Sequence, residues 1–566
     1  MAPDYSQRKY ALQRWAALLS ERSSWDATYL QISRYVLPFA GRFYHSDRNW
    51  GNKTYDAIID NTPTRASGIL AAGMMGGNSS PARPWFRVTT QDPQLADRDN
   101  VKLWFSIVAE IMREIFSQSN TYRALHSMYE QLGVFGTATN ILDDNYDSMI
   151  WNTPLTIGQF CIGADEFGRA NTLFRQYEKP LSQVVARFVQ TNPKSGSLDW
   201  SNASQTLKNL WDQNKFDTWV PLMHAIQPRE MANREYGKPG TKNMPFSSCY
   251  YELNASEEKI LHESGYKTFP VLAPRWHTYG SDIMGVGPGH VALGDVKQLQ
   301  HEQLRKTQGI DYQSLPPVAV PAEFKGREID TLPGGVSALG ISANGKIQNL
   351  FDVKLDLGAL LEDIQDVRSR INSAFFADLF LMLVNNPSVQ PVTATEIAEK
   401  KEEKLLMLGP VLERLNDEML SPLIVHTFAR MVATGVLPPA PPELHNADIK
   451  VEFVSVLAQA QRAVGLASID KLIGTVMVMS QGKQDPSVWD KVDTDKAIDK
   501  YSDMLAVDPE LIVADDKVAL IRKGRAQQQQ AQQAAQAAPL AAQAMKNAAQ
   551  AHQASPGMTE QLMGYS

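Results

Sequence analysis

The chain has 566 residues, of which 43% are hydrophobic, 21% charged and 9% aromatic, a length that predicts three or four cooperating parts. Its 55 basic and 62 acidic side chains give a net charge of −7, which argues against a clamp that holds nucleic acid by clustered Lys and Arg. The only cysteines, Cys161 and Cys249, exclude a cysteine-based zinc site and favour a reducing, intracellular setting.

Residues 1–149 are predicted to be mainly helical. Apolar residues recur at steps of three or four over residues 10–36, until Pro38 ends the pattern. The run 73–77 is rich in glycine and precedes two prolines, so we expect a loop there. A second helix is expected over residues 101–116, with an apolar face formed by Leu103, Ile107, Ile111 and Ile115.

Residues 150–288 contain short apolar and aromatic runs separated by Gly, Pro and Asn, which predicts a β-rich part with antiparallel strands. At its end, the run 285–290 is similar to a loop that cradles phosphate at the start of a helix. However, Pro288 removes one amide donor, and His290 stands where a dinucleotide site needs its third glycine. We therefore interpret this run as a flexible joint before the next helix.

A helix is predicted over residues 289–313. In residues 314–353, four prolines and five glycines exclude a long helix, and Asn344-Gly345 is a strong signal for a hairpin turn between two short strands. Residues 340–347 begin with GxxxxGK, but Ile347 stands where a nucleotide-binding P-loop needs Ser or Thr for magnesium. We interpret the run as a turn.

A further helix is predicted within residues 354–384, as a straight rod of roughly 37 Å for some 25 residues. Its most apolar run, 374–384, contains Asp378 and is shorter than the roughly 20 apolar residues that cross a bilayer. We therefore expect no membrane span in the run 374–384. The next segment, 385–392, carries no charged side chain.

Thr393–Glu396 form a capping box, which predicts the start of a long helix over residues 393–437. Prolines inside the pattern predict kinks at Gly409-Pro410 and at Pro422. A proline cluster then begins at Pro438, and helical periodicity returns from Val454. The last forty residues are mostly Ala and Gln, so they are either disordered or a helix held only by neighbouring copies.

Motifs that carry catalytic or metal chemistry are missing. The sequence has no HExxH zinc motif and no GxSxG nucleophile elbow. Asp143, Asp144 and Asp147 form an acidic cluster, but it lacks the spacing and terminal Glu of a calcium-binding EF-hand, so we favour a solvated turn. No catalytic residue, metal or cofactor is expected.

The order of predicted elements is helix, Pro/Gly-rich β insert, helix, short loop and long kinked helix. Together with the short runs below, this order resembles the portal, or head-to-tail connector, proteins of short-tailed double-stranded DNA bacteriophages, over residues 5–525. The runs are Leu70–Met75, Ser79-Ser80-Pro81, Pro84-Trp85-Phe86, Arg275-Trp276, Tyr279-Gly280, Gly287-Pro288-Gly289, Thr393–Ile397, Leu408-Gly409-Pro410, Arg414-Leu415 and Leu420–Ile424.

The resemblance implies an α+β, mainly α, portal-type fold that assembles as a ring. Such a fold has a wing, a helical stem, a β-containing clip, a long kinked helix and a helical crown. In this chain it implies an N-terminal helical part of the wing (1–149), a β-rich wing (150–288), stem helix 1 (289–313), a clip (314–353), stem helix 2 (354–384), a tunnel loop (385–392), the long kinked wing helix (393–437), a crown (438–525) and a tail that is a barrel helix or disordered (526–566).

In this family DNA passes through the centre of the ring, so the resemblance also implies residues that face the channel. An uncharged tunnel loop would touch DNA by weak polar contacts without trapping it. Basic side chains on the stem helices are candidate phosphate contacts, with salt bridges to a neighbouring subunit as the alternative. The tunnel-loop residues are Asn385, Asn386, Ser388, Val389 and Gln390, and the basic stem residues are Lys297, Arg305, Lys306, Arg368 and Arg370.

The function implied is structural and not enzymatic: a dodecameric ring at one capsid vertex, made in the host cytoplasm, through which double-stranded DNA is packaged and ejected. Its implied partners are the terminase large subunit, a tail adaptor or head completion protein, the major capsid protein, scaffolding protein and internal ejection proteins, with no membrane. Two alternatives are another ring-forming virion component, such as a tail adaptor or collar, and an ATP-driven DNA translocase. The incomplete P-loop argues against the translocase.

Overall fold

The computed structural model describes residues 7–43, 57–314, 357–384, 407–444 and 449–454, apart from positions 97, 192–195, 232–233, 239 and 256–258. It also describes residues 318–319 and 348–349 and short stretches beyond residue 471. Contacts divide the chain into two units, residues 1–461 and 462–566. In the second unit, the described residues 472–479, 520–529 and 543–547 are helical; all elements below belong to the first unit.

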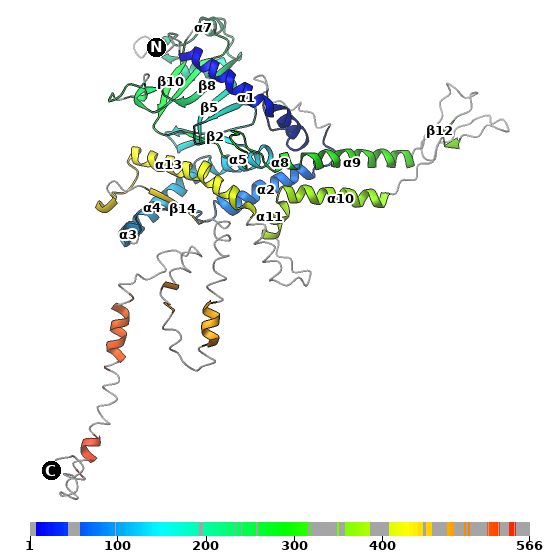
Figure 1. Cartoon of the computed structure of the whole chain (residues 1–566). Coiled ribbons are helices and arrows are strands. Elements are labelled where there is room, and N and C mark those ends of the chain that lie inside the picture. The colour runs from blue at the N-terminus through cyan, green and yellow to red at the C-terminus, as the bar shows by residue number, and fades with distance from the viewer. Residues whose placement is uncertain are drawn as a thin grey trace. The chain divides into compact units, whose positions relative to one another are not determined.

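The predicted β-rich part is confirmed as antiparallel sheets (Figure 1). A three-stranded sheet begins before residue 150 and has the order β11 (Val271–Leu272), β2 (Thr139–Asn145), β3 (Met149–Leu155). A two-residue pair joins β6 (Gln190–Thr191) to β7 (Leu198–Asp199). The largest sheet has the order β10 (His262–Tyr266), β9 (Phe246–Glu252), β8 (Trp219–Pro228), β5 (Ala170–Pro180), β4 (Phe160–Ala164).

Helices cover both faces of this five-stranded sheet. Side chains alternate between the two faces of a strand, and here both faces carry apolar side chains that need to be buried. Met223 and Ala225 of β8 share a buried cluster with Trp15 of α1 (Gln7–Tyr35). Leu222, from the opposite face, shares a second cluster with residues of α6 (Leu181–Phe188) and α7 (Gln205–Asp212). Arg8 fixes the start of α1 by donating to the backbone carbonyl oxygens of Glu252 and Ala255, at 2.9 and 2.8 Å.

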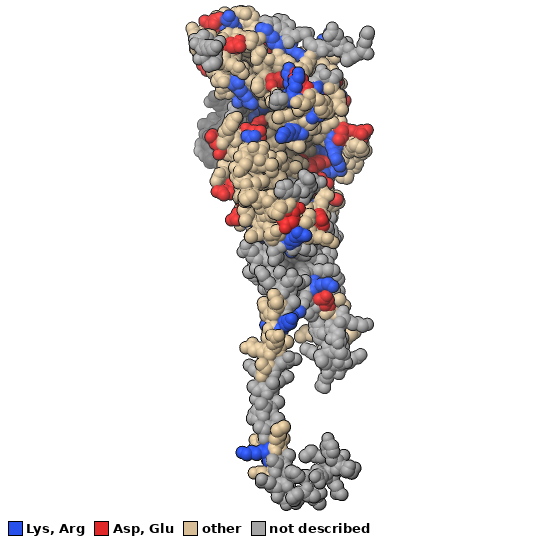
Figure 2. Space-filling view, turned by 90° about the vertical axis from the view of Figure 1, so that its left-hand side faces the viewer, with Lys and Arg blue, Asp and Glu red and all other residues tan. Residues whose placement is uncertain are grey.

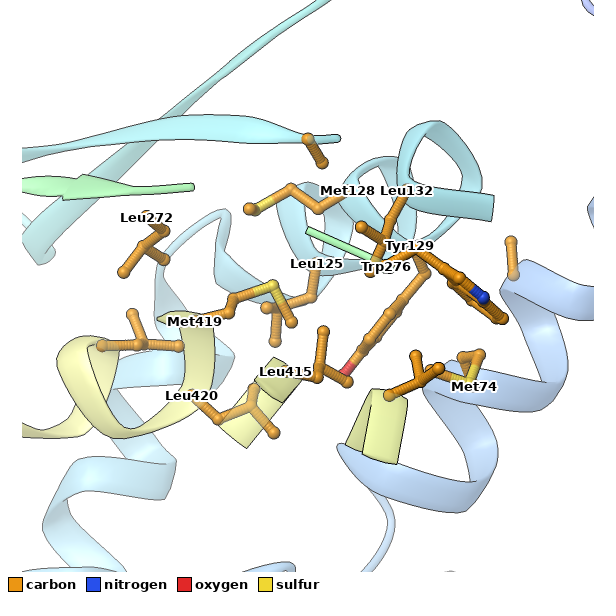
Figure 3. Close-up of a cluster of buried hydrophobic side chains, with 14 of the residues drawn as sticks. Met74, Leu125, Met128, Tyr129, Leu132, Leu272, Trp276, Leu415, Met419 and Leu420 are labelled. Carbon is orange, nitrogen blue, oxygen red and sulfur yellow. The ribbon is translucent and has the colours of Figure 1, made fainter. Parts of the chain in front are cut away.

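A larger buried cluster, which we call the helical core, lies between several packed helices and the strands next to them. Figure 3 shows part of it, where Met74, Tyr129, Trp276 and Met419 converge from different segments. Helices that contribute buried side chains to it include α1, α2 (Thr62–Asn78), α4 (Asp99–Gln118), α5 (Thr121–Phe135), α9 (Leu293–Ser314), α10 (Leu357–Ala374), α11 (Ala377–Val384) and α13 (Ser421–Thr434). The short helix α8 (Pro288–Val291) precedes α9. Short helical turns lie at α3 (Pro93–Ala96), Thr241–Asn243 and Pro442–Leu444.

The predicted loop at 73–77 is wrong, since these residues lie inside α2. Glycine weakens an isolated helix, which is why the run indicated a loop. Here Gly73 lies in close contact with the ring of Phe380, a packing that a larger side chain would block. Tertiary packing therefore overrides the local preference of the glycines.

The predicted helix over 101–116 is confirmed as α4, but its predicted apolar face is only partly buried. Leu103 and Ile107 are 54% and 39% exposed, whereas Ile115 is buried. The face that packs inward is wider and aromatic, with Trp104, Phe105, Val108 and Met112. The aromatic side chains of Trp104 and Phe105 bury large apolar areas, which favours this face of the helix over the predicted one.

The predicted straight rod within 354–384 is also wrong, because α10 ends at Ala374 and α11 begins at Ala377. Phe376, between them, has a backbone φ of 54°. That left-handed conformation ends a right-handed helix and is uncommon for a residue with a side chain. Apolar periodicity continues through the break, so the sequence pattern does not reveal it.

The run 285–290 is not a flexible joint. Its glycines approach the backbone at the end of α5: a Cβ on Gly285 would lie 2.3 Å from the carbonyl oxygen of Gly136, and one on Gly289 2.1 Å from that of Val134. Glycine is needed here for close packing. Burial lowers the pKa of His290 to about 4, so this ring is neutral at pH 7.

Three predictions concern the long helix around Pro422, the segment before Val454 and the hairpin turn at 344–345. A helix over 407–415 and a π-helical turn at Asn416–Leu420 precede α13, so the helix is irregular just before Pro422, where a kink was expected. A strand, β14 (Ile449–Phe453), precedes Val454 and pairs with β1 (Phe86–Thr90), a pairing not predicted. The predicted turn at 344–345 and the run 340–347 lie outside the described residues, although β12 (Val318–Ala319) and β13 (Gln348–Asn349) around them do pair.

Candidate functional site

The predicted helix over 289–313 is confirmed by α8 and α9, and α9 lies side by side with α10 (Figure 1). The two helices project from the rest of the first unit. Near the helical core their apolar side chains are buried, among them Val296 and Leu299 of α9 and Val367 of α10. The pair is therefore anchored at one end by ordinary apolar packing.

Farther from the core, apolar side chains of the same two helices are exposed. We call residues 304–314 of α9 and 357–361 of α10 the distal half of the pair. Four of its large apolar side chains lie between 42% and 49% exposed, and these are Leu304, Ile310, Tyr312 and Leu361, whereas Leu360 is partly buried against the helical core. Exposed apolar side chains on a projecting helix pair are candidates for contact with another protein.

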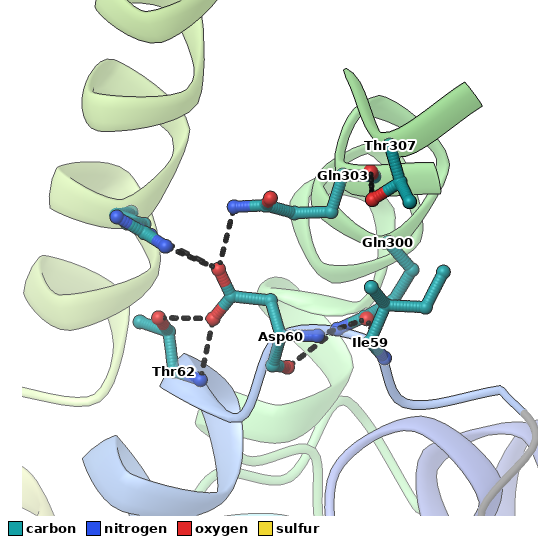
Figure 4. Close-up of polar contacts among 7 residues, drawn as sticks. Ile59, Asp60, Thr62, Gln300, Gln303 and Thr307 are labelled. Carbon is teal, nitrogen blue, oxygen red and sulfur yellow. Dashed lines mark hydrogen bonds and ion pairs between the residues drawn. The ribbon is translucent and has the colours of Figure 1, made fainter. Parts of the chain in front are cut away.

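Asp60 joins the pair to the start of α2 (Figure 4). Its carboxylate accepts hydrogen bonds from Arg368 of α10 at 2.7 and 3.0 Å and from Gln303 of α9 at 2.9 Å. The other carboxylate oxygen accepts from the backbone N–H and the hydroxyl of Thr62, at 2.9 and 2.6 Å. One side chain therefore holds three helices together.

The backbone around Asp60 is also fixed. The Gln300 side chain of α9 accepts from the N–H groups of Ile59 and Asp60 at 2.7 and 2.8 Å, and donates to the Asp60 carbonyl at 2.8 Å. Burial by itself would raise the pKa of Asp60, but the hydrogen bonds from Thr62 and Arg368 and the charge of Arg368 outweigh it and lower the pKa. Asp60 is thus charged at neutral pH.

Three of the five basic stem candidates have partners outside their own helix. Arg368 pairs with Asp60, Arg370 lies 3.6 Å from Asp295 and 3.5 Å from Asp366, and Lys297 donates to Gln31 at 2.6 Å. Arg305 is exposed and donates to Gln308 at 3.3 Å, while Lys306 is half-buried. A phosphate contact by the first three would have to compete with these partners, so the role of all five in DNA contact stays a prediction.

The candidate tunnel-loop residues, 385–392, lie outside the described residues, as does the capping box at 393–396. The structure describes the helices on either side, α11 up to Val384 and the helix from residue 407. Candidate stem and tunnel-loop residues are therefore not brought together by described contacts.

The acidic cluster is not only a solvated turn. Asp144 forms a salt bridge to Arg430 of α13 at 3.2 Å, and Asp143 accepts from the hydroxyl of Tyr266 at 3.3 Å. No group of three or more metal-ligating side chains occurs in the part of the chain that the structure describes. Within that same part, no helix is both long and apolar enough to cross a membrane.

Two polar contacts were missed by sequence reasoning. Asp60-Asn61-Thr62-Pro63 has the composition of a helix start, with Pro63 in the first turn, but nothing in the pattern shows that α9 and α10 would share Asp60. Arg275 pairs with Glu418 of the π-helical turn at 2.6 Å and also donates to the Gly168 carbonyl at 2.8 Å. These partners are more than 100 residues apart, so only the fold reveals them.

Charge on the molecular surface is mixed. On the face shown in Figure 2, basic and acidic side chains are interspersed over the described residues, and no part of that face is covered by basic side chains alone. This agrees with the net charge of −7. That face does not show the basic stripe typical of a nucleic-acid clamp.

The sequence matches one family model and two phage proteins over most of its length. The family model of the bacteriophage head to tail connecting protein matches residues 8–513. The chain is 50% identical over 529 residues to a probable portal protein of Bordetella phage BPP-1, covering 93% of both chains. It is 40% identical over 555 residues to the portal protein of Salmonella phage epsilon15, covering 97% of both.

Solved structures align more loosely. The neck of an empty gene transfer agent particle aligns with a TM-score of 0.36 and 11% identity, over 77% of this chain and 92% of that chain. A native gene transfer agent virion gives 0.34 and 9%, over 79% and 94%. The family match and the two phage relatives span nearly the whole sequence, and from them it follows that the chain belongs to the bacteriophage head-to-tail connecting, or portal, protein family, which is structural and not enzymatic.

Proposed function

We propose that the chain assembles as a closed ring of twelve copies at one capsid vertex, with a central channel for double-stranded DNA. The observation that carries this proposal is the distal half of the α9–α10 pair, whose apolar side chains are about half exposed in a single chain. Neighbouring copies would cover them, since a head-to-tail contact repeated around an axis closes into a ring.

Within the channel, the segment 385–392 would act as the tunnel loop, with Asn385, Asn386, Ser388, Val389 and Gln390 near the DNA. It has no charged side chain, so it would not hold the phosphates strongly. Of the basic stem residues, Arg305 and Lys306 are the best candidates for phosphate contacts, because Lys297, Arg368 and Arg370 have partners outside their own helix.

The clip, residues 314–353, would bind the terminase large subunit during packaging and a tail adaptor or head completion protein afterwards. The wing, residues 1–288 and 393–437, would contact the major capsid protein and scaffolding protein. The crown, 438–525, and the tail, 526–566, would meet internal ejection proteins. Family membership supports these assignments, and the chain would be made in the host cytoplasm before it joins the virion.

Native mass spectrometry with negative-stain imaging tests the ring. Twelve copies of the 62.9 kDa chain would weigh about 755 kDa, and images should show a central hole. Because some rings need a nucleating partner, a monomer would be measured again with scaffolding protein. Monomers or dimers under both conditions would contradict the proposal.

Deletion of the clip tests the partner assignment. A chain that lacks residues 314–353 should lose binding to the terminase large subunit and to the tail adaptor, whereas a chain that lacks residues 526–566 should keep both. Intact binding after clip deletion would show that another surface is responsible.

A further inference from the structure

The corner between α10 and α11 separates the stem from the helix that leads to residue 385. Phe376 has a backbone φ of 54°, and its ring lies 6.1 Å from that of Trp276. Phe375, beside it, is fully buried. A left-handed residue interrupts the helical hydrogen-bond ladder, so α11 does not continue the axis of α10. The direction of α11 is therefore not determined by the axis of α10, and contacts with other elements have to determine it.

Packing against α2 provides that constraint. The ring of Phe380, on α11, lies directly against Gly73 of α2: a Cβ at position 73 would be 2.1 Å from Phe380 Cγ and 2.3 Å from Cδ1. Phe380 is 3% exposed. By contrast, a Cβ at Gly68 or Gly76 of the same helix would meet no neighbouring atom within 4 Å, so of these three glycines only Gly73 makes the close approach.

The helix α2 is itself fixed at several points along its length. At its start, Asp60 joins it to α9 and α10. In its middle, Leu70 packs against Gly133 of α5, where a Cβ would lie 2.5 Å from Leu70 Cδ2. At its end, the hydroxyls of Ser79 and Tyr129 are hydrogen-bonded at 2.8 Å. A helix held in this way is a rigid support for whatever packs on it.

We propose that α2 sets the position of α11, with Gly73 and Phe380 as positioning residues for the chain that leaves α11 at Val384. In this arrangement α10 ends at the corner, and the packing of α2 against α11 determines the direction of α11. The functional consequence rests on the proposed function, in which the residues after α11 face the DNA channel.

Distance measurements between two spin labels test the positioning. Leu381, which is 42% exposed on α11, and Ser106, exposed on α4, would each be replaced by cysteine and labelled. The native Cys161 and Cys249 are buried, and burial raises the pKa of each thiol to about 11, so neither competes for the label. Labelled chains would be diluted with unlabelled chains, so that each ring carries one pair.

The variant Gly73→Ala should lengthen or shorten the 106–381 distance by about 1.5 to 2 Å, because the Phe380 ring has to move out to ordinary carbon contact. Gly76→Ala, the matched control, should leave the distance unchanged. The double variant Gly73→Ala with Phe380→Ala should bring it back toward the original value, a rescue that general destabilisation would not produce. An unchanged distance in Gly73→Ala would overturn the inference.

Phe380→Ala alone is the second variant, in case Gly73→Ala does not fold. Without the ring α11 loses its contact with Gly73, so the distance distribution should broaden, and an unchanged distribution would also overturn the inference. DNA packaging by the same variants separates the two proposals. If Gly73→Ala shifts the distance but particles package DNA normally, the positioning stands and the channel role of the residues after α11 fails.

Discussion

The helical core and the distal half of the α9–α10 pair contain similar apolar side chains in different surroundings. In the core, Trp85, Phe116 and Tyr129 are at most 1% exposed. In the distal half, Leu304, Ile310 and Leu361 are more than 40% exposed. The core is completed by its own chain, whereas the distal half leaves apolar surface that a single chain does not cover.

Polar contacts differ between the helical core and the α9–α10 pair as a whole in the same way. Inside the core, Arg275 and Glu418 are 8% and 21% exposed and hold the π-helical turn against the loop before α8. On the pair, Arg370 is 47% exposed and its acidic partners lie 3.5 and 3.6 Å away. Exposed pairs of this kind contribute little to stability. The core is therefore completed within the chain, whereas the distal half has the exposed apolar surface that the proposed contact between copies would cover.

The largest effect is expected in the core, at Glu418. Glu418→Ala would leave Arg275 without its carboxylate partner, and should lower the free energy of unfolding by about 2 to 4 kcal/mol, because breaking a buried ion pair leaves an uncompensated charge. Chemical denaturation measures this. Asp417→Ala, at an exposed neighbouring position, is the control and should change little. Equal effects of both variants would show that the pair does not stabilise the core.

Gly73→Ala should have the next largest effect, a loss of about 1 to 3 kcal/mol from overpacking against Phe380. Gly76→Ala should instead stabilise the chain by up to about 1 kcal/mol, because alanine is a better helix former and has space there. Thermal denaturation of both variants checks the opposite signs. If both stabilise, the core tolerates a methyl group at position 73.

Asp60→Asn should cost about 1 to 2 kcal/mol at pH 7, because hydrogen bonds to a charged group contribute more than neutral ones. The folded chain lowers the pKa of Asp60, so its contribution is complete above its ordinary pKa of 3.8 and is lost as the pH falls through the lower folded value. The difference between wild type and variant should therefore shrink below pH 4. Asp366→Asn, at a 67% exposed position, is the control.

That pH dependence is measured by urea denaturation of both chains between pH 3 and 7. A difference that stays constant over this range would contradict a charged Asp60 at the base of the pair.

The smallest effect on the stability of a single chain is expected in the distal half. Leu361→Glu should change the free energy of unfolding of the monomer by less than about 0.5 kcal/mol, as surface substitutions usually do. The same variant should abolish the ring in native mass spectrometry, since a charge would be buried between copies. Met231→Glu, at a 75% exposed position away from the pair, should leave the ring intact.

The regular helices and the antiparallel sheet could be predicted because their patterns are local. Apolar spacing of three to four residues predicted α1, α4 and α9, and short runs between turn residues predicted the strands. Features set by distant partners could not be predicted. Gly73 is helical because Phe380 packs on it, and β14 forms because residues 86–90 offer an edge to pair with.

The candidate site was predicted only in outline. The sequence predicted phosphate contacts or salt bridges to a neighbouring subunit for the basic stem residues, but Arg368 has Asp60 of the same chain as a partner, more than 300 residues away. The corner at Phe376 is invisible in the sequence because both sides of it are apolar. The sequence pattern shows which side chains are apolar, and the fold decides what buries them.

Hydrogen exchange on dilute monomers and on the assembled ring tests the central comparison most directly. The amides of α5 in the helical core should be equally protected in both states. The amides of residues 304–314 and 357–361 should exchange quickly in the monomer and be protected in the ring, because neighbouring copies cover them. Equal protection of the distal half in monomer and ring would contradict the dependence on neighbouring copies.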